Sequence, residues 1–179
     1  ECDCDFVTSG QMVIDGRILE EYKATQVKDP IERRGVDSNI WIWDPPNYTK
    51  DYVVSADVSR GDGTDYSAFH VMDVEDCKQV AEYKGKLGTK DFGNLLVNVA
   101  TEYNNALLVI ENASIGWAAI QQCIDREYDN LFYMSKDLQY VDTQKQLTNK
   151  IYSQEKQMVP GFTMSMKTRP LVIAKLEEF

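Results

Sequence analysis

The sequence predicts an α/β domain built around a mixed β-sheet, and three observations support this class. Residues 52–56 form a short, β-rich apolar run of the kind found in buried strands, and the run ends on the carboxylate of Asp57. Residues 107–110 form a second apolar run, which is too short for a typical helix and ends on Glu111. The segment between the runs contains a helix-like stretch, as a crossover between parallel strands requires.

The first run and the segment after it predict an antiparallel hairpin. Residues 59–64 are rich in turn formers, and strand-like character resumes over residues 66–72. Asp57 then ends one strand and Asp65 opens the next. Two carboxylates beside a tight turn suit a hard divalent cation, but Asp and Gly are also common in ordinary turns.

The two strand-end acids are the candidate site. If the two buried strands are parallel neighbours, Asp57 and Glu111 emerge side by side at the carboxyl edge of the sheet, where open α/β sheets bind ligands. Residues 117–125 predict a helix whose N-terminus lies close to Glu111. Its backbone amides could meet an anion, or only water.

Residues 1–50 are the least regular part of the chain. Asp15–Arg17 resembles a hairpin turn between short apolar pieces, and a breaker at 44–47 precedes the first buried run. We therefore expect a small hairpin, a loop and a strand beside the core. Trp41 and Trp43 alternate with isoleucines, which favours packing over base stacking.

Local patterns predict the elements between the two candidate acids and just after them. Residues 78–84 alternate and are charged, which is typical of an outer strand. Thr89 is a credible N-cap for a helix over residues 90–103, whose apolar residues have helical spacing. Residues 131–133 predict a further short strand.

The last part of the chain predicts a loop followed by a helix. Lys136–Pro160 is polar and weakly periodic, which favours a mobile surface loop. Thr168 is expected to cap a helix that begins near Pro170, because proline is favoured in the first helical turn. This helix runs to Phe179 without a capping glycine, as in a fragment of a longer protein.

Composition indicates a soluble globular domain inside a cell. The chain has 179 residues, of which 43% are hydrophobic and 27% charged, and no apolar run reaches membrane-spanning length. The acidic first residues do not resemble a secretory signal. Cys2 and Cys4 lack a zinc spacing, and His70 is the sole histidine and is expected on a strand, so free thiols are the expected state.

The net charge of −10 is unevenly distributed. Residues 136–175 carry seven basic groups against three acids, a net charge of +4, so the remainder carries −14. An acidic body with a basic segment fits a metal centre beside a phosphate-contacting surface. It also fits a solvated surface with no partner.

Three motifs together resemble a known family. The chain contains, in order, Asp-x-x-x-Gly-x-Gly-x-Asp-Tyr-Ser-Ala from Asp57, Val-Ile-Glu-Asn at 109–112 and Lys-Thr-Arg-Pro-Leu at 167–171. This order resembles the nuclease domain of the large terminase subunit of tailed bacteriophages, a member of the RNase H-like superfamily. The resemblance implies an RNase H-like α/β fold: a central mixed β-sheet with an N-terminal β-hairpin and helices on both faces.

The resemblance also implies a division of the chain. Residues 1–50 correspond to the segment that joins the family's ATPase motor to its nuclease, and residues 51–179 to the nuclease domain, truncated at its C-terminal end. No Walker A pattern occurs in the sequence, so the motor itself is not included.

Carried over by motif, the resemblance makes Asp57 and Glu111 catalytic metal ligands and gives Asp65 a supporting catalytic role. The family's third carboxylate is expected beyond the end of this chain. The late acids of the chain do not stand in the family's motif context: Asp137, Asp142, Glu177 and Glu178.

The implied chemistry is hydrolysis of concatemeric double-stranded DNA by a two-metal site that uses Mg²⁺ or Mn²⁺. With one ligand missing, we expect the chain alone to be weakly active or inactive. DNA would be held through its phosphates, with strong salt dependence, by basic residues of the 136–175 region, for which the candidates are Lys136, Lys145, Lys150, Lys167 and Arg169.

The implied partners, besides DNA, are the portal protein and the small terminase subunit, with no membrane involved. The implied location is the host cytoplasm, transiently at the capsid portal and outside the mature virion. The isolated domain is expected to be a monomer.

Three alternatives remain at the level of the sequence. Another RNase H-like nuclease, such as a Holliday-junction resolvase, is the nearest enzyme alternative, and the Lys167–Leu171 motif and the N-terminal joining segment favour the terminase over it. A non-catalytic domain that docks on DNA or the portal would use them only as hairpin and strand-end residues. An ATPase with an actin-like phosphate loop at residues 57–63 is disfavoured, because a second glycine-rich phosphate loop is absent.

Overall fold

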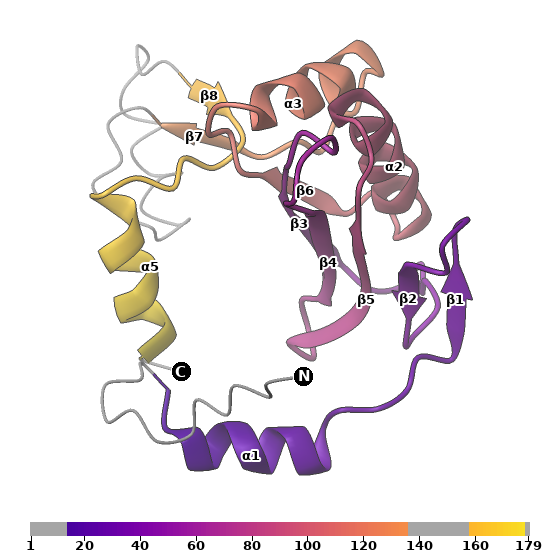
Figure 1. Ribbon diagram of the computed structural model, residues 1–179, viewed down its shortest axis with the longest axis vertical. Helices are drawn as coiled ribbons and strands as arrows, with labels where there is room; N and C mark the ends of the chain where they lie inside the picture. Colours follow the sequence, from indigo (N-terminus) through magenta and orange to yellow (C-terminus); the bar gives the residue numbers. More distant parts are fainter. Residues whose placement is uncertain (1–13, 136–157, 178–179) are drawn as a thin grey trace.

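The computed structural model describes residues 14–135 and 158–177, and its centre is a six-stranded sheet in the order β1-β2-β5-β4-β3-β6 (Figure 1). Only β3 and β6 are parallel; the other neighbours are antiparallel, so the sheet is mixed as the sequence predicts. The strands have the following bounds: β1 Glu32–Arg34, β2 Ile40–Ile42, β3 Tyr52–Asp57, β4 Ser67–Asp73, β5 Lys78–Gly85 and β6 Leu107–Ile110.

Two helices, α2 (Thr89–Glu102) and α3 (Gly116–Asp125), pack on each other and cover one face of the sheet (Figure 1). Residues of β3 alternate between buried and more exposed, so the strand presents one apolar face to these helices. Phe69 of β4 and Phe92 of α2 are fully buried there. Full burial of such a side chain contributes about 1.5–3 kcal/mol to stability.

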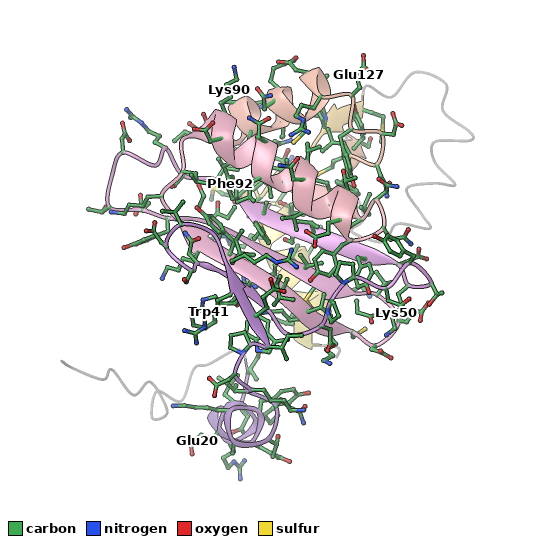
Figure 2. All side chains as sticks on the ribbon, turned by 90° about the vertical axis from the view of Figure 1, so that its right-hand side faces the viewer. Glu20, Trp41, Lys50, Lys90, Phe92 and Glu127 are labelled. Carbon is green, nitrogen blue, oxygen red and sulfur yellow. The ribbon has the colours of Figure 1, made fainter. Side chains whose placement is uncertain are left out.

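The opposite face of the sheet is more open. In Figure 1, helix α5 (Thr168–Glu177) lies on the side of the sheet away from α2 and α3. Helix α1 (Gly16–Thr25) buries no residue and lies below the sheet in Figure 2. Side chains that point to this open face are therefore accessible.

A second, two-stranded sheet lies next to β6. It consists of β7 (Tyr133–Ser135) and β8 (Met158–Pro160), which are antiparallel. Isolated bridges from Leu108 to Leu131 and from Glu111 to Phe162 connect this part to the end of β6. The C-terminal segment is thereby anchored beside Glu111.

The structure corrects two predictions in the first half of the chain. Asp15 begins no hairpin turn: its carboxylate accepts the backbone N–H of Arg17 at 2.9 Å and caps α1, a role that suits Asp as well as a turn does. Residues 78–84 do not form an outer strand, because β5 pairs with both β4 and β2. The hairpin of β1 and β2 covers the edge that local charge suggested was free.

Smaller corrections concern element ends. Helix α2 is capped by Gly88, and Thr89 is its first residue. The hydroxyl of Ser165, rather than that of Thr168, accepts the first backbone N–H groups of the C-terminal helix, while the buried Thr168 hydroxyl donates to the carbonyl of Thr163 at 2.8 Å.

The predicted strand at 131–133 forms as β7 two residues later, at Tyr133–Ser135. Of the predicted loop at Lys136–Pro160, the last three residues form β8, and residues 136–157 lie outside the described part. His70 lies on β4, as predicted, and Cys77 and Cys123 are free thiols. Among the described residues, no helix is long and apolar enough to cross a membrane.

Candidate functional site

The parallel pairing of β3 with β6 brings Asp57 and Glu111 together. Ala56 is in register with Ile110, and the backbone N–H of Glu111 donates to the carbonyl of Ala56 at 3.0 Å. The two acids occupy the next position on each strand, and adjacent strands lie about 4.8 Å apart. The predicted side-by-side arrangement of the two acids at the carboxyl edge of the sheet is therefore present.

The environment of Glu111 disfavours its ionised form. Burial raises the pKa of the half-buried Glu111, the negative charge of Asp57 raises this pKa further, and Arg169 at the start of α5 lowers it. Desolvation and a neighbouring like charge both make the carboxylate costly. A cation bound between the two acids would relieve both effects.

The turn from β6 into α3 fixes the backbone of Glu111. A Cβ atom on Gly116, the first residue of α3, would lie 1.8 Å from the carbonyl oxygen of Glu111, so only glycine fits there. The buried Asn112 donates from Nδ2 to the carbonyl of Pro160 at 3.0 Å and accepts the hydroxyl of Thr163 at 2.8 Å. This asparagine connects the strand that carries Glu111 to the C-terminal segment.

Sequence reasoning assigned no role to Asn112 or Gly116. The Val-Ile-Glu-Asn motif does include the asparagine, and that motif was the available signal. The close approach of Gly116 to a carbonyl five residues earlier leaves no mark in the sequence beyond a glycine at the predicted helix start.

The β3–β4 hairpin forms a groove beside Asp57 with a volume of about 380 Å³. Asp65 and Asp62 line the same groove, so the structure places the predicted supporting acid near Asp57. The loop is held by the Ser67 hydroxyl, which accepts the backbone N–H of Ser59 at 3.0 Å. Glu111 is not among the groove's lining residues and approaches Asp57 from the β6 side.

Comparison with solved structures then decides the fold. The magnesium-bound large terminase nuclease of the thermophilic phage G20c matches with a TM-score of 0.50 at 21% identity, covering 70% of this chain and 62% of that one. The chain has the fold of a phage large terminase nuclease. The RNase H-like α/β class and the family resemblance predicted from the motifs are confirmed at the level of fold.

Two further structures of this terminase nuclease fold give similar values. The zinc-bound form of the G20c nuclease matches with a TM-score of 0.49 at 20% identity, covering 57% of each chain. The nuclease domain of Thermus phage P74-26 matches with a TM-score of 0.47 at 22% identity, covering 70% of this chain and 60% of that one. The chain thus spans roughly three-fifths of these nucleases, from 57% to 62%. No protein-family model matches the sequence, and no curated protein sequence matches it either.

The chemistry of the acid pair suits a hard divalent cation. Mg²⁺ is commonly bound through one or two carboxylates, with water and substrate phosphate oxygens completing its six ligands. Asp57 and Glu111 supply two such carboxylates at the ends of adjacent parallel strands. Within residues 14–135 and 158–177, no group of three or more His, Cys, Asp or Glu side chains could hold a metal ion.

The structure describes part of the predicted basic surface of the terminase-like domain. Lys167 and Arg169 are exposed at the start of α5, and Arg169 is close enough to Glu111 to lower the pKa of that carboxyl. Lys136, Lys145 and Lys150 lie outside the described residues. Their contact with DNA stays a prediction.

Proposed function

We propose that this chain is the nuclease domain of a phage large terminase and that it hydrolyses phosphodiester bonds of concatemeric double-stranded DNA with divalent cations. The observation that carries the proposal is the adjacent placement of Asp57 and Glu111 at the carboxyl ends of parallel strands. Such paired carboxylates are costly for a fold and suit a site that uses them. The fold matches a nuclease that was solved with bound magnesium.

Asp57 and Glu111 would hold the cations. A divalent cation pair supplies, when bound, a water of lowered pKa and stabilisation of the leaving oxygen. The contribution of the chain is to fix the acids: the strand pairing sets their separation, and Gly116 and Asn112 hold the Glu111 backbone. Asp65 would act from the groove as a supporting acid.

Arg169 adds a positive charge to this site. It stands near Glu111, where its positive charge favours the ionised carboxylate. A phosphate group that approaches the acids would meet the same guanidinium, which binds phosphate well. Lys136, Lys145, Lys150 and Lys167 would add sequence-independent phosphate contacts.

We further propose that residues 51–179 form the nuclease domain, with residues 1–50 as a segment that joins it to an ATPase motor. The domain would act in the host cytoplasm, transiently at the capsid portal and outside the mature virion, with the portal protein and the small terminase subunit as partners. Two carboxylates hold two cations less well than three do. We therefore expect Mg²⁺ or Mn²⁺ to bind weakly and the purified chain, a monomer, to cleave slowly.

Calorimetry of Mn²⁺ binding tests the proposal. Wild type is compared with Asp57→Asn and Glu111→Gln, and Asp129→Asn serves as the control because Asp129 is an exposed acid on a turn past α3. Loss of binding in both site variants, with binding kept in Asp129→Asn, supports the metal centre. Plasmid cleavage in Mn²⁺ is measured in parallel.

Equal Mn²⁺ binding by all four proteins, together with no cleavage, would sink the nuclease proposal. A domain that only docks on DNA or the portal would then be the better account. Fast cleavage by wild type that disappears in Asp57→Asn would instead show that two carboxylates are enough and would overturn only the expectation of weak activity.

A further inference from the structure

An exposed tyrosine with two lysines lies beside the candidate metal centre. Tyr66, at the end of the β3–β4 loop, has 48% of its surface exposed and lines the same groove as Asp57. The Nζ atoms of Lys84 and Lys86 each lie 5.0 Å from the centre of its ring. Both lysines are exposed. We call Tyr66, Lys84 and Lys86 the tyrosine–lysine surface.

Strand register places this surface on the open face, in line with the acids. Asp57 is paired with Ala68 of β4, and Ala68 is paired with Lys84 of β5. Paired residues on antiparallel strands point to the same face, so Asp57 and Lys84 share the face opposite the core. At about 4.8 Å per strand, Lys84 lies about 10 Å from Asp57.

Ala68, the residue between Asp57 and Lys84 across the sheet, leaves the surface between them open. Ala68 carries a single methyl group, so little side chain rises between Asp57 and Lys84. One strand of duplex DNA carries a phosphate about every 3.4 Å of helix axis. A duplex whose axis runs along the row from Asp57 to Lys84 therefore presents about three phosphates of one strand between the acids and Lys84.

The positive charges of Lys84 and Lys86 are available to a ligand. Lys50 is paired with Asp73 at 2.5 Å, and Lys78 is paired with Asp44. Neither Lys84 nor Lys86 has such a carboxylate partner among the described residues. The ring of Tyr66 attracts an ammonium group through its π-face without neutralising it.

We propose that the tyrosine–lysine surface binds the phosphate backbone of substrate DNA a few nucleotides from the bond that is cut. This inference rests on the proposed nuclease function and adds residues that neither the basic 136–175 region nor the acid pair includes. The exposed Asp62 and Asp65 line the groove and repel phosphate there, while Lys84 and Lys86, which flank the groove residue Tyr66, attract it. The lysines thus hold a neighbouring phosphate, and the scissile phosphate is left to the divalent cations at Asp57 and Glu111.

Anisotropy of a labelled duplex in EDTA tests the surface without cleavage. The double variant Lys84→Gln/Lys86→Gln is compared with wild type from about 50 to 200 mM salt, the range over which phosphate contacts weaken. We expect roughly tenfold weaker binding at the low-salt end and a slope of log K against log salt that is smaller by about 2. Tyr66→Phe keeps the ring and should bind like wild type, whereas Tyr66→Ala frees the lysines and should lose part of the affinity.

The matched control removes the same charge elsewhere. Lys23 lies in α1 and Lys28 just after it, and both are exposed. In Figure 2, α1 lies at the end of the molecule opposite Lys90, a residue only four positions after Lys86. Lys23→Gln/Lys28→Gln should leave the affinity and the salt slope close to wild type. Thermal unfolding of each variant checks that the fold is retained.

Two results would overturn the proposed DNA binding by the tyrosine–lysine surface, and they differ in whether they also overturn DNA as the substrate. If the Lys84→Gln/Lys86→Gln variant matches wild type in affinity and salt slope, this surface does not bind DNA. The proposed metal centre is unaffected by that result, because Mn²⁺ binding tests it separately. If wild type shows no salt-dependent binding to duplex DNA, both the surface and DNA as the substrate are wrong.

Discussion

Replacing Gly116 with alanine should displace the backbone that carries Glu111. The added methyl carbon would lie 1.8 Å from the carbonyl oxygen of Glu111. Close carbon–oxygen contacts in proteins are about 3.3 Å, so the gap must open by about 1.5 Å. The obstructing atom is a backbone atom and cannot rotate away, so the β6–α3 turn has to move.

The size of the effect follows from that displacement. Inserting a methyl group into a packed site costs about 1–3 kcal/mol, and a backbone obstruction belongs at the upper end, about 3 kcal/mol. A chain of this length loses about 2–4 °C of melting temperature per kcal/mol, so we expect a fall of about 6–12 °C. A misplacement of about 1 Å at a functional site can cost about a hundredfold, so Mn²⁺ affinity should fall as well.

Thermal unfolding by circular dichroism measures the first effect, and calorimetry with Mn²⁺ measures the second. Gly63→Ala is the control, since a Cβ atom there meets nothing within 4 Å. It should change stability by less than about 0.5 kcal/mol. If Gly116→Ala melts at the same temperature as Gly63→Ala and binds Mn²⁺ equally, the argument that this glycine holds Glu111 in place is refuted.

Three further predictions concern the Glu111 segment and the core beneath α2. Asn112→Ala removes the bonds to Pro160 and Thr163 and should cost about 1–3 kcal/mol in urea unfolding, whereas an unchanged midpoint would show that the C-terminal segment is held by other contacts. Because the pKa of Glu111 is raised in the folded state, its ionisation costs stability as the pH rises from the unfolded to the folded pKa. Glu111→Gln should therefore be more stable than wild type at neutral pH and lose this advantage below both pKa values, and a pH-independent difference in urea midpoints would contradict the assignment. Phe92→Ala empties a fully buried site under α2 (Figure 2) and should cost about 3–5 kcal/mol by the same measurement, and a loss below about 1 kcal/mol would contradict that burial.

The strands that carry the acids were predictable because their signals are local. An apolar run of four or five residues that ends on a carboxylate indicates both a buried strand and the position of its last side chain. The parallel pairing of β3 and β6 then follows from the helix between them. By contrast, β2 is three residues long, and its pairing with β5 depends on residues about 40 positions apart, which no local pattern indicates.

The prediction of a hairpin turn at Asp15 was wrong because aspartate is favoured both in turns and at helix N-caps. Asp15 is as good an N-cap as it is a turn residue, and the helix that follows it buries nothing that would give it a clear apolar stripe. Gly116 and Asn112 were missed for a different reason. Their roles depend on atoms of Glu111, Pro160 and Thr163 that the fold brings close, so their chemistry exists only once the second sheet is in place.

The position of Lys84 shows how far local pattern can mislead about the site. Counting back from the β4–β5 turn, where Asp73 pairs with Lys78, would set Ala68 opposite Tyr83. The register shifts by one residue between Val71 and Met72, and Ala68 pairs with Lys84 instead. A shift of one residue exchanges the two faces of a strand.

The extra residue lies on β5, where Val80 and Ala81 are consecutive and both are buried, with 1% exposed. A bulge of this kind re-aims the side chains beyond it. It turns Tyr83 into the core, where its ring stacks 5.5 Å from that of Phe69, and turns Lys84 onto the open face, two strands away from Asp57. The same irregularity therefore completes the aromatic core and places a lysine on the face that carries the acids, so the core and the proposed DNA surface depend on one register.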